Sequence, residues 1–149
     1  MSLELKITTA LKEAMKSKNQ IALTALRAVK SAILLHKTQK SFDVELSHED
    51  EMKILQKLVK QRKDSADIYA GQGRNDLADP ELKEVEIIQQ FLPKALSEDV
   101  VKEVVKSIID ETGAEGMKDM GKVMGLSTKK LMGKADGKTI STIVKELLS

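Results

Sequence analysis

A chain of 149 residues without a cysteine excludes disulfides, thiolate metal sites and thiol nucleophiles. Its 41% of hydrophobic residues is mostly Leu, Ile, Val, Ala and Met, a composition that suits helices, because the aromatics are only Phe42, Tyr69 and Phe91. A net charge of +2 excludes a uniformly basic or acidic chain, so affinity for a polyanion would have to come from a local patch.

No apolar stretch approaches the about 20 residues of a transmembrane span, so no membrane partner is expected. The N-terminal segment Met1–Lys16 is amphipathic and carries both charge signs. It lacks the continuous apolar run and the small-residue cleavage site of a signal peptide. With the missing cysteines, these features predict a cytoplasmic protein.

Helical periodicity runs through the first part of the chain. A first helix is predicted after an N-cap at Ser2, with a break near Asn19, and a second helix is predicted to end before a loop at Lys40–Val44. Ser47, with Asp50 three residues later, is predicted to cap a third helix. The three apolar stripes are Leu3, Ile7, Leu11 and Met15; Ala22, Ala25, Leu26, Val29 and Ile33; and Met52, Leu55, Leu58, Val59, Arg62, Ala66 and Tyr69.

A fourth helix is predicted to end near Phe91–Leu92, because Pro93 disfavours helix at the residue before it. Two starts are compatible with the sequence. Asp79–Pro80 can supply an N-cap and a first helical residue, or Pro80 can kink a helix that began near Arg74.

The sequence of the C-terminal part predicts three further helical segments. Ser97 is a predicted N-cap, Gly113 a predicted C-terminal cap, Met117–Met132 a fifth apolar-periodic segment, and Asp136 the cap of a last helix. The inward candidates are Val101, Val104, Val105, Ile108 and Ile109; Met117, Met120, Val123, Met124 and Leu131; and Ile140, Ile143, Val144, Leu147 and Leu148.

The fold class predicted from these patterns is all-α, with no useful β-type alternation. A long-helix hairpin or bundle is expected over residues 1–93, and a compact three-helix bundle over residues 97–149.

Candidate catalytic groups are scarce. His36 and His48 lie far apart without a metal-ligand pattern, so structural roles are favoured over ligation or base catalysis. No Walker loop, GxSxG elbow or HExxH motif occurs, and Gly71–Asp76 lacks the lysine of a phosphate loop. A self-contained active site is therefore not expected, and neither a cofactor nor a metal is predicted.

The segment Lys60–Asp79 interleaves basic and acidic residues. Lys60–Asp64 and Lys63–Asp67 have the spacing of ion pairs on a helix surface. A salt-bridged end of a helical hairpin, with Arg62 and Tyr69 reaching across to the next helix, is favoured over a polar recognition face.

The most unusual stretch is Asp119–Gly137 with its flanks, where glycines and lysines concentrate. Six of the eight glycines lie between Gly113 and Gly137, and six lysines lie among only two aspartates, Asp119 and Asp136. Lysines near helix N-termini can bind phosphates, whereas glycines such as the Gly121–Gly125 pair can serve close helix packing. Contact with an RNA backbone and a solvated face with packing glycines are both compatible with the pattern. The lysines are Lys118, Lys122, Lys129, Lys130, Lys134 and Lys138.

Several motifs together resemble the YqeY family of small proteins with a GatB/YqeY-type domain. They are KQRKDS at Lys60–Ser65, Tyr69, GRNDLA at Gly73–Ala78, FLPKALS at Phe91–Ser97, and then DMGKVMG and GKADG. The resemblance covers essentially the whole chain. The departures are Pro80 and Phe91, which stand where a helix former and a tyrosine are expected.

The C-terminal half also resembles the tail domain of the GatB subunit of glutamine-dependent tRNA amidotransferases, through Gly121, Val123, Met124, Gly133, Ala135 and Asp136. The resemblance implies an accessory protein related to carbon–nitrogen ligases that use glutamine as amide donor. It carries over a tRNA-contacting part and no catalytic residues. The implied partners are tRNA and an amidotransferase or aminoacyl-tRNA synthetase component. The expected RNA-binding residues are Lys118, Lys122, Lys129, Lys130 and Lys134, positioned by Gly121, Gly125, Gly133 and Gly137.

Two alternatives stay open. In the first, the chain is a protein-interaction module without an RNA role, and methionines form the groove for a partner. In the second, it is an independent enzyme acting on glutamine, for which the residues offer little support. The methionines of the first alternative are Met117, Met120, Met124 and Met132.

Overall fold

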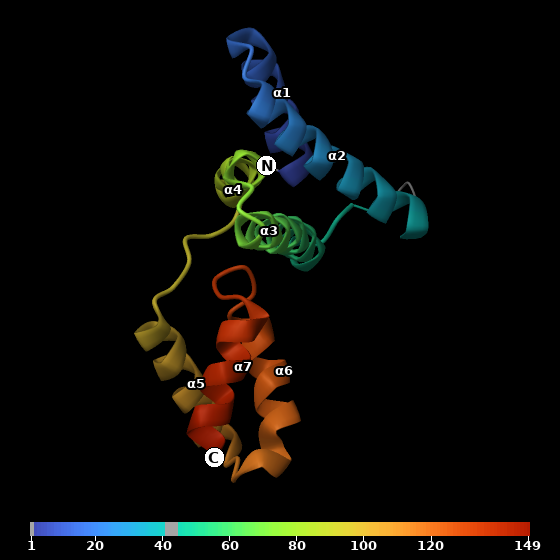
Figure 1. The fold of residues 1–149 in the computed structure, drawn as a ribbon. Helices are drawn as coiled ribbons and strands as arrows, with labels where there is room; N and C mark the ends of the chain where they lie inside the picture. The colour runs from blue at the N-terminus through green and yellow to red at the C-terminus, as the bar shows by residue number, and fades with distance from the viewer. Residues whose placement is uncertain (1, 41–44) are drawn as a thin grey trace. The chain divides into compact units, whose positions relative to one another are not determined.

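A computed structural model describes residues 2–40 and 45–149, and every regular element within these ranges is helical (Figure 1). The all-α prediction is confirmed. The expected loop at Lys40–Val44 falls largely outside the described residues, while Lys40 itself ends a helix. The elements are α1 (Leu3–Ser17), α2 (Gln20–Lys40), α3 (His48–Gly71), α4 (Asn75–Gln89), α5 (Glu98–Thr112), the 3-10 turn η1 (Met117–Asp119), α6 (Met120–Lys130) and α7 (Gly137–Leu148).

Four predicted N-caps set the helix starts. The side chains of Ser2, Ser47, Ser97 and Asp136 each accept a hydrogen bond from the backbone N–H three residues later, at 3.3, 3.1, 3.4 and 2.7 Å. Each bond satisfies one backbone donor that has no partner within its helix. The predicted caps are therefore confirmed, and they begin α1, α3, α5 and α7.

The chain divides by its contacts into two compact units, Met1–Leu92 (unit 1) and Pro93–Ser149 (unit 2). In unit 1, α1 packs on α2, and α4 packs on both α2 and α3. Its buried core is aliphatic, and two methionines, Met15 and Met52, show how position decides burial: Met52 is buried, whereas Met15 is exposed. The other core residues are Leu3, Ile7, Leu11, Ala14, Ala22, Leu23, Ala25, Leu26, Val29, Ile33, Leu55, Val59, Ala66, Ala78, Val85 and Ile88.

The exposure of Met15 corrects the predicted stripe of the first helix. Four residues advance an α-helix by about 40° beyond a full turn, so three such steps from Leu3 turn Met15 about 120° away from the core. Ala14 takes the inward position instead and is buried.

The observed first residue of α4 distinguishes between the two starts that the sequence allowed for this helix. The helix begins at Asn75 and contains Pro80, so the interpretation of Asp79–Pro80 as its first residues is wrong. Ala78 in the preceding turn is buried, and this packing holds the turn helical although Pro80 supplies no backbone N–H donor.

The α3–α4 hairpin carries a partly buried ion pair. Arg62 Nε lies 3.3 Å from Glu84 Oε1, with only 15% and 13% of the two side chains exposed. A second guanidinium N–H, from Nη1, donates to the Leu58 carbonyl at 3.2 Å. The predicted reach of Arg62 to the next helix is thus confirmed, as is the exposed Lys60–Asp64 pair at 2.8 Å.

Not every predicted pair forms. Lys63 and Asp67 make no ion pair with each other within the described chain, although their spacing allows one. Both side chains are exposed, and in water such pairs gain too little free energy to hold a fixed geometry.

Unit 2 is a three-helix bundle in which α5, α6 and α7 pack on one another (Figure 1). The predicted segment Met117–Met132 is a 3-10 turn followed by α6, and Met117 is 48% exposed, so its inward assignment is wrong. Leu131 lies beyond the end of α6 and still enters the core. The core consists of Val101, Val105, Ile108, Val123, Leu131, Ile140, Ile143, Val144 and Leu148.

Ser127→Ala should stabilise the protein. Ser127 is fully buried, and its hydroxyl finds no hydrogen-bond partner within the described residues. Because an unsatisfied buried hydroxyl costs roughly 1–3 kcal/mol, the substitution should raise the free energy of unfolding by about 1 kcal/mol in urea denaturation. Thr128→Ala, at the exposed neighbouring position, controls for helix propensity and should give about 0.5 kcal/mol or less. A loss of stability in Ser127→Ala would show that the hydroxyl is bonded.

Arg62→Met should lower the free energy of unfolding by about 1.5–3 kcal/mol, because it leaves the Glu84 carboxylate partly buried without its charged donor. Thermal and urea unfolding measure the change. The matched control is Lys60→Met, which removes an exposed pair and should change stability by less than about 1 kcal/mol. If both substitutions lowered the free energy of unfolding equally, the partly buried Arg62–Glu84 pair would contribute no more to stability than the exposed pair, contrary to the prediction.

Candidate nucleic-acid interface

The five lysines predicted to bind RNA are all exposed in unit 2. Lys118 lies in η1, Lys122, Lys129 and Lys130 lie in α6, and Lys134 lies in the turn before α7. None of them forms an ion pair with a described residue. All ion pairs found in the described parts of the chain join residues of unit 1. The ammonium groups of this part of unit 2 are therefore available to an external anion.

The two sides of α6 differ sharply in character. Val123 and Ser127 are fully buried and define the inward side of the helix. At about 100° per residue, Gly125 lies opposite to them, and Gly121 and Lys129 lie within one side-chain position of Gly125. Lys122 adjoins this exposed side, which we call the α6 outer face: Gly121, Lys122, Gly125 and Lys129.

Gly121 and Gly125 are not required by packing within the chain. Apart from the adjacent residues and the backbone of its own helix, a Cβ atom at either position would meet no described atom within 4 Å, and neither residue has a positive φ. The interpretation that their spacing admits another helix of this chain is therefore wrong for the described structure. Each glycine still costs roughly 1 kcal/mol in a helix interior relative to alanine.

Gly133 and Gly137 have different surroundings. Gly133 is buried with φ 77°, a conformation that glycine adopts far more readily than other residues. Gly137 is exposed and opens α7 behind the Asp136 cap. The turn between α6 and α7 is held by its backbone, since the Lys134 carbonyl accepts a 2.9 Å hydrogen bond from the N–H of Leu96. Gly133 thus shapes the turn that carries Lys134, and it is not part of an exposed surface.

Charge is segregated within unit 2, a feature that only the helix bounds reveal. The α5 helix carries five acidic residues against two lysines, whereas Met117–Lys138 carries six lysines against two aspartates. The positive potential is therefore concentrated around η1, α6 and the start of α7. The acidic residues of α5 are Glu98, Asp99, Glu103, Asp110 and Glu111.

The surface chemistry of unit 2 limits how it can contact a nucleic acid. The sequence from Pro93 to Ser149 contains no aromatic residue, so stacking on single-stranded bases has no platform there. Lysines and exposed backbone suit phosphates instead. Leu126, one turn after Lys122, is 43% exposed and adds an apolar side chain to this surface, although it is not among the residues predicted from the sequence.

The methionines do not make a continuous exposed groove. Met120 and Met124 are half-buried and pack against the core of unit 2, as structural methionines do. Met132 is also half-buried, and Met117 alone of the four is largely exposed.

The histidines show no catalytic arrangement in the described chain. His36 Nε2 lies 3.4 Å from Asp50 Oδ2, which also pairs with Lys40 at 3.4 Å and so joins the end of α2 to the start of α3. Desolvation raises the pKa of the Asp50 carboxyl, but the Ser47 hydrogen bond and the charges of Lys40 and His36 outweigh it and leave the pKa lowered. Among residues 2–40 and 45–149, no cluster of three or more His, Cys, Asp or Glu side chains could hold a metal ion. None of the described helices is long and apolar enough to cross a membrane.

Comparison with known proteins identifies relatives in fungi and archaea. The chain is 37% identical over 107 residues to "Altered inheritance of mitochondria protein 41, mitochondrial" of Clavispora lusitaniae, covering 70% of this chain and 61% of that protein. It is 32% identical over 133 residues to the protein of the same name from Kluyveromyces lactis, covering 87% of this chain and 67% of the relative.

A partial match links the chain to tRNA amidotransferases. It is 37% identical over 70 residues to a subunit of the glutamyl-tRNA(Gln) amidotransferase of Thermococcus gammatolerans. The match covers 44% of this chain and only 11% of that larger protein. It agrees with the relation to the GatB tail domain predicted from the C-terminal motifs.

The comparisons contradict the prediction of a cytoplasmic protein, because the fungal relatives are named as mitochondrial proteins. That prediction rested on absent cysteines and an absent signal peptide. Neither feature separates the cytoplasm from another reducing compartment. The model of the Yqey-like protein family matches residues 4–148. Since this match spans nearly the whole chain, the protein belongs to the YqeY-like family.

Proposed function

We propose that the protein binds the backbone of a folded tRNA through the α6 outer face, together with Lys118, Lys130 and Lys134. In this proposal it is an accessory factor of tRNA-dependent amidation, a carbon–nitrogen ligase reaction with glutamine as amide donor. The chemistry belongs to a partner such as an amidotransferase or an aminoacyl-tRNA synthetase component. One observation carries the proposal: lysines that form no ion pair with a described residue surround two glycines that packing among the described residues does not require.

The two glycines are important to the proposal because, without side chains, they leave the helix backbone uncovered at these positions. A helix that exposes backbone at two positions one turn apart lets a ligand approach more closely than side chains of ordinary size permit. Lys122 and Lys129 stand beside this low surface and can reach phosphates on either side of it. A bulky anionic backbone fits this combination better than a small anion, for which one helix terminus would suffice.

The absence of aromatic residues from the sequence of unit 2 indicates which kind of RNA contact is favoured. Without aromatic residues between Pro93 and Ser149, recognition by stacked bases is disfavoured, and contact with the sugar–phosphate backbone of a folded RNA is favoured. The acidic α5 helix repels the same backbone and would orient it toward α6. The partial likeness to a protein named for glutamyl-tRNA(Gln) supports tRNA as the RNA class.

A second candidate function is docking of a protein partner on the same unit. Met117 and Leu126 are exposed by 48% and 43%, and exposed apolar side chains of this size favour protein contacts. A complex that survives both nuclease treatment and high salt would support this candidate over tRNA binding.

Charge reversal on the basic surface should weaken tRNA binding. The triple substitution Lys122→Glu, Lys129→Glu and Lys130→Glu should reduce affinity for labelled tRNA by at least about tenfold at low salt. It should also make the negative slope of log affinity against log salt concentration shallower by about 3, because each lost phosphate contact means that about one counterion fewer is released on binding. Fluorescence anisotropy over a salt series measures both quantities.

The control is the triple substitution Lys102→Glu, Lys106→Glu and Lys145→Glu, which makes the same total change in charge at two lysines of α5 and one of α7. Its effect should be much smaller. Equal losses in both variants would mean that net charge alone drives binding, and unchanged affinity in the α6 variant would reject the site.

Filling the glycine surface should separate stability from binding. Gly121→Ala and Gly125→Ala have open space and no positive φ, so each should raise the free energy of unfolding by about 0.5–1 kcal/mol. The double variant should nevertheless bind tRNA about fivefold or more weakly, because the added methyl groups crowd the RNA backbone. Gly71→Ala, equally unhindered in unit 1, is the control. Stabilisation with unchanged binding would show that the RNA does not approach α6 at the glycines.

A further inference from the structure

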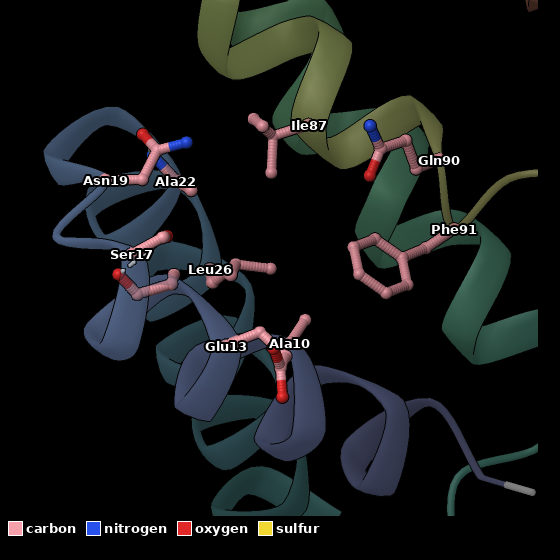
Figure 2. Close-up of a pocket in the computed structure, with 10 residues that line it drawn as sticks. Ala10, Glu13, Ser17, Asn19, Ala22, Leu26, Ile87, Gln90 and Phe91 are labelled. Atoms are coloured by element: carbon pink, nitrogen blue, oxygen red, sulfur yellow. Dashed lines mark hydrogen bonds between the residues drawn. The ribbon is translucent and has the colours of Figure 1, made fainter.

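A pocket of about 410 Å³ lies in unit 1, where α1 ends, α2 begins and α4 ends. Figure 2 shows Ile87, Gln90 and Phe91 on one side of the hollow, and Ser17, Asn19 and Leu26 on the other. Alanines on α1 and α2 leave the space between these groups unfilled. The volume is that of a site for a small ligand or a large side chain.

The polar groups of the pocket have hydrogen-bonding capacity to spare. The Ser17 hydroxyl donates to the Ala14 carbonyl at 3.3 Å and can still accept. Asn19 Oδ1 accepts from the N–H of Ala22 at 3.1 Å, which leaves its amide NH₂ group. The side-chain amide of Gln90 forms no hydrogen bond within the described residues, although its backbone N–H donates to the Ile87 carbonyl. The Ser17 hydroxyl and the Gln90 side-chain oxygen therefore remain as acceptors for a ligand, whereas Asn19 offers only N–H donors.

The electrostatic character of the pocket favours a cation. Glu13, whose side chain is 72% exposed, contributes a carboxylate at the rim of the pocket, and its one ion-pair partner in the described chain, the 78% exposed Lys16, lies 4.0 Å away. The C-terminal ends of α1 and α4 meet the pocket, and helix C-termini carry partial negative charge. The opposing N-terminus of α2 has one backbone donor already satisfied by Asn19.

We propose that this pocket binds a guanidinium group carried on an aliphatic stem. A guanidinium is planar, pairs with a carboxylate through two parallel hydrogen bonds, and stacks on aromatic rings. Glu13 supplies the carboxylate and the half-buried Phe91 supplies the ring. The side chains of Leu26 and Ile87 cover the stem, and Gln90 offers an amide oxygen to the remaining N–H groups. An ammonium group has neither the flat face nor the paired donors.

The proposal is independent of tRNA binding, because the pocket and the α6 outer face belong to different units. The guanidinium can come from a free small molecule or from an arginine side chain of a partner protein. Both present the same chemistry to the pocket, and the probes below distinguish them.

The experiment titrates the full chain with N-acetyl-L-argininamide and follows backbone amides by two-dimensional NMR. N-acetyl-L-citrullinamide, which has the same shape without the charge, is the comparison. Arginine should shift the signals of Ser17, Asn19, Gln90 and Phe91 and bind about tenfold or more tightly than citrulline, because charge-assisted bidentate hydrogen bonds are lost with the neutral group. Equal binding of the two probes, or no shift with either, would overturn the proposal.

Two substitutions locate the interaction. Glu13→Gln should abolish the preference for arginine over citrulline, whereas Glu86→Gln, an exposed position on α4 outside the pocket, should retain it. Glu13 is itself exposed, so its replacement should leave the fold intact, and the unperturbed core signals verify this. A preference that survives Glu13→Gln would overturn the proposed role of the carboxylate. 1-Butylguanidine has the same single charge and aliphatic stem without the peptide groups, so binding about tenfold more tightly than that of the capped arginine would identify a free guanidine as the ligand, and comparable or weaker binding would identify an arginine side chain.

Discussion

The burial of one narrow side of α6 determines the surface of unit 2. Val123 and Ser127 from the helix, with Leu131 just beyond it, enter the core between α5 and α7. A helix of 11 residues anchored in this way has a single allowed rotation about its axis, because turning it would bring lysines into an aliphatic core. Everything proposed for the outer face depends on this rotation. The same anchoring explains why the exposed glycines are tolerated, since packing on the opposite side stabilises the helix.

The two units handle charge differently. In unit 1, acidic and basic side chains pair on helix surfaces and across the α3–α4 hairpin, and the Arg62–Glu84 pair is the least exposed of those found among the described residues. In unit 2 the charges are separated, with acidic residues concentrated on α5 and lysines on η1, α6 and the following turn. Paired charges cancel at a distance, whereas separated charges leave a local field that acts on a charged partner. The small net charge of +2 therefore does not reveal that acidic and basic residues are separated within unit 2.

The two proposed sites use opposite electrostatics. The basic surface of unit 2 suits a polyanion, and the pocket of unit 1, lined by Glu13 near two helix C-termini, suits a cation. Neither site resembles a catalytic centre with a positioned nucleophile and base. Membership of the YqeY-like family, shown by a match over residues 4–148, applies to both units alike.

The fold class, the helix caps and most of the buried stripes follow from local patterns in the amino-acid sequence. A serine before an apolar period caps a helix wherever it occurs, as Ser47 and Ser97 show. The motifs also sufficed to identify the family. Features that depend on neighbours distant in sequence required the folded chain. Packing of Ala78 kept Pro80 inside α4, and the open space beside Gly121 and Gly125 excluded packing against another described helix of the chain as their purpose. The pocket joins residues from α1, α2 and α4, so no periodicity within one helix could have predicted it.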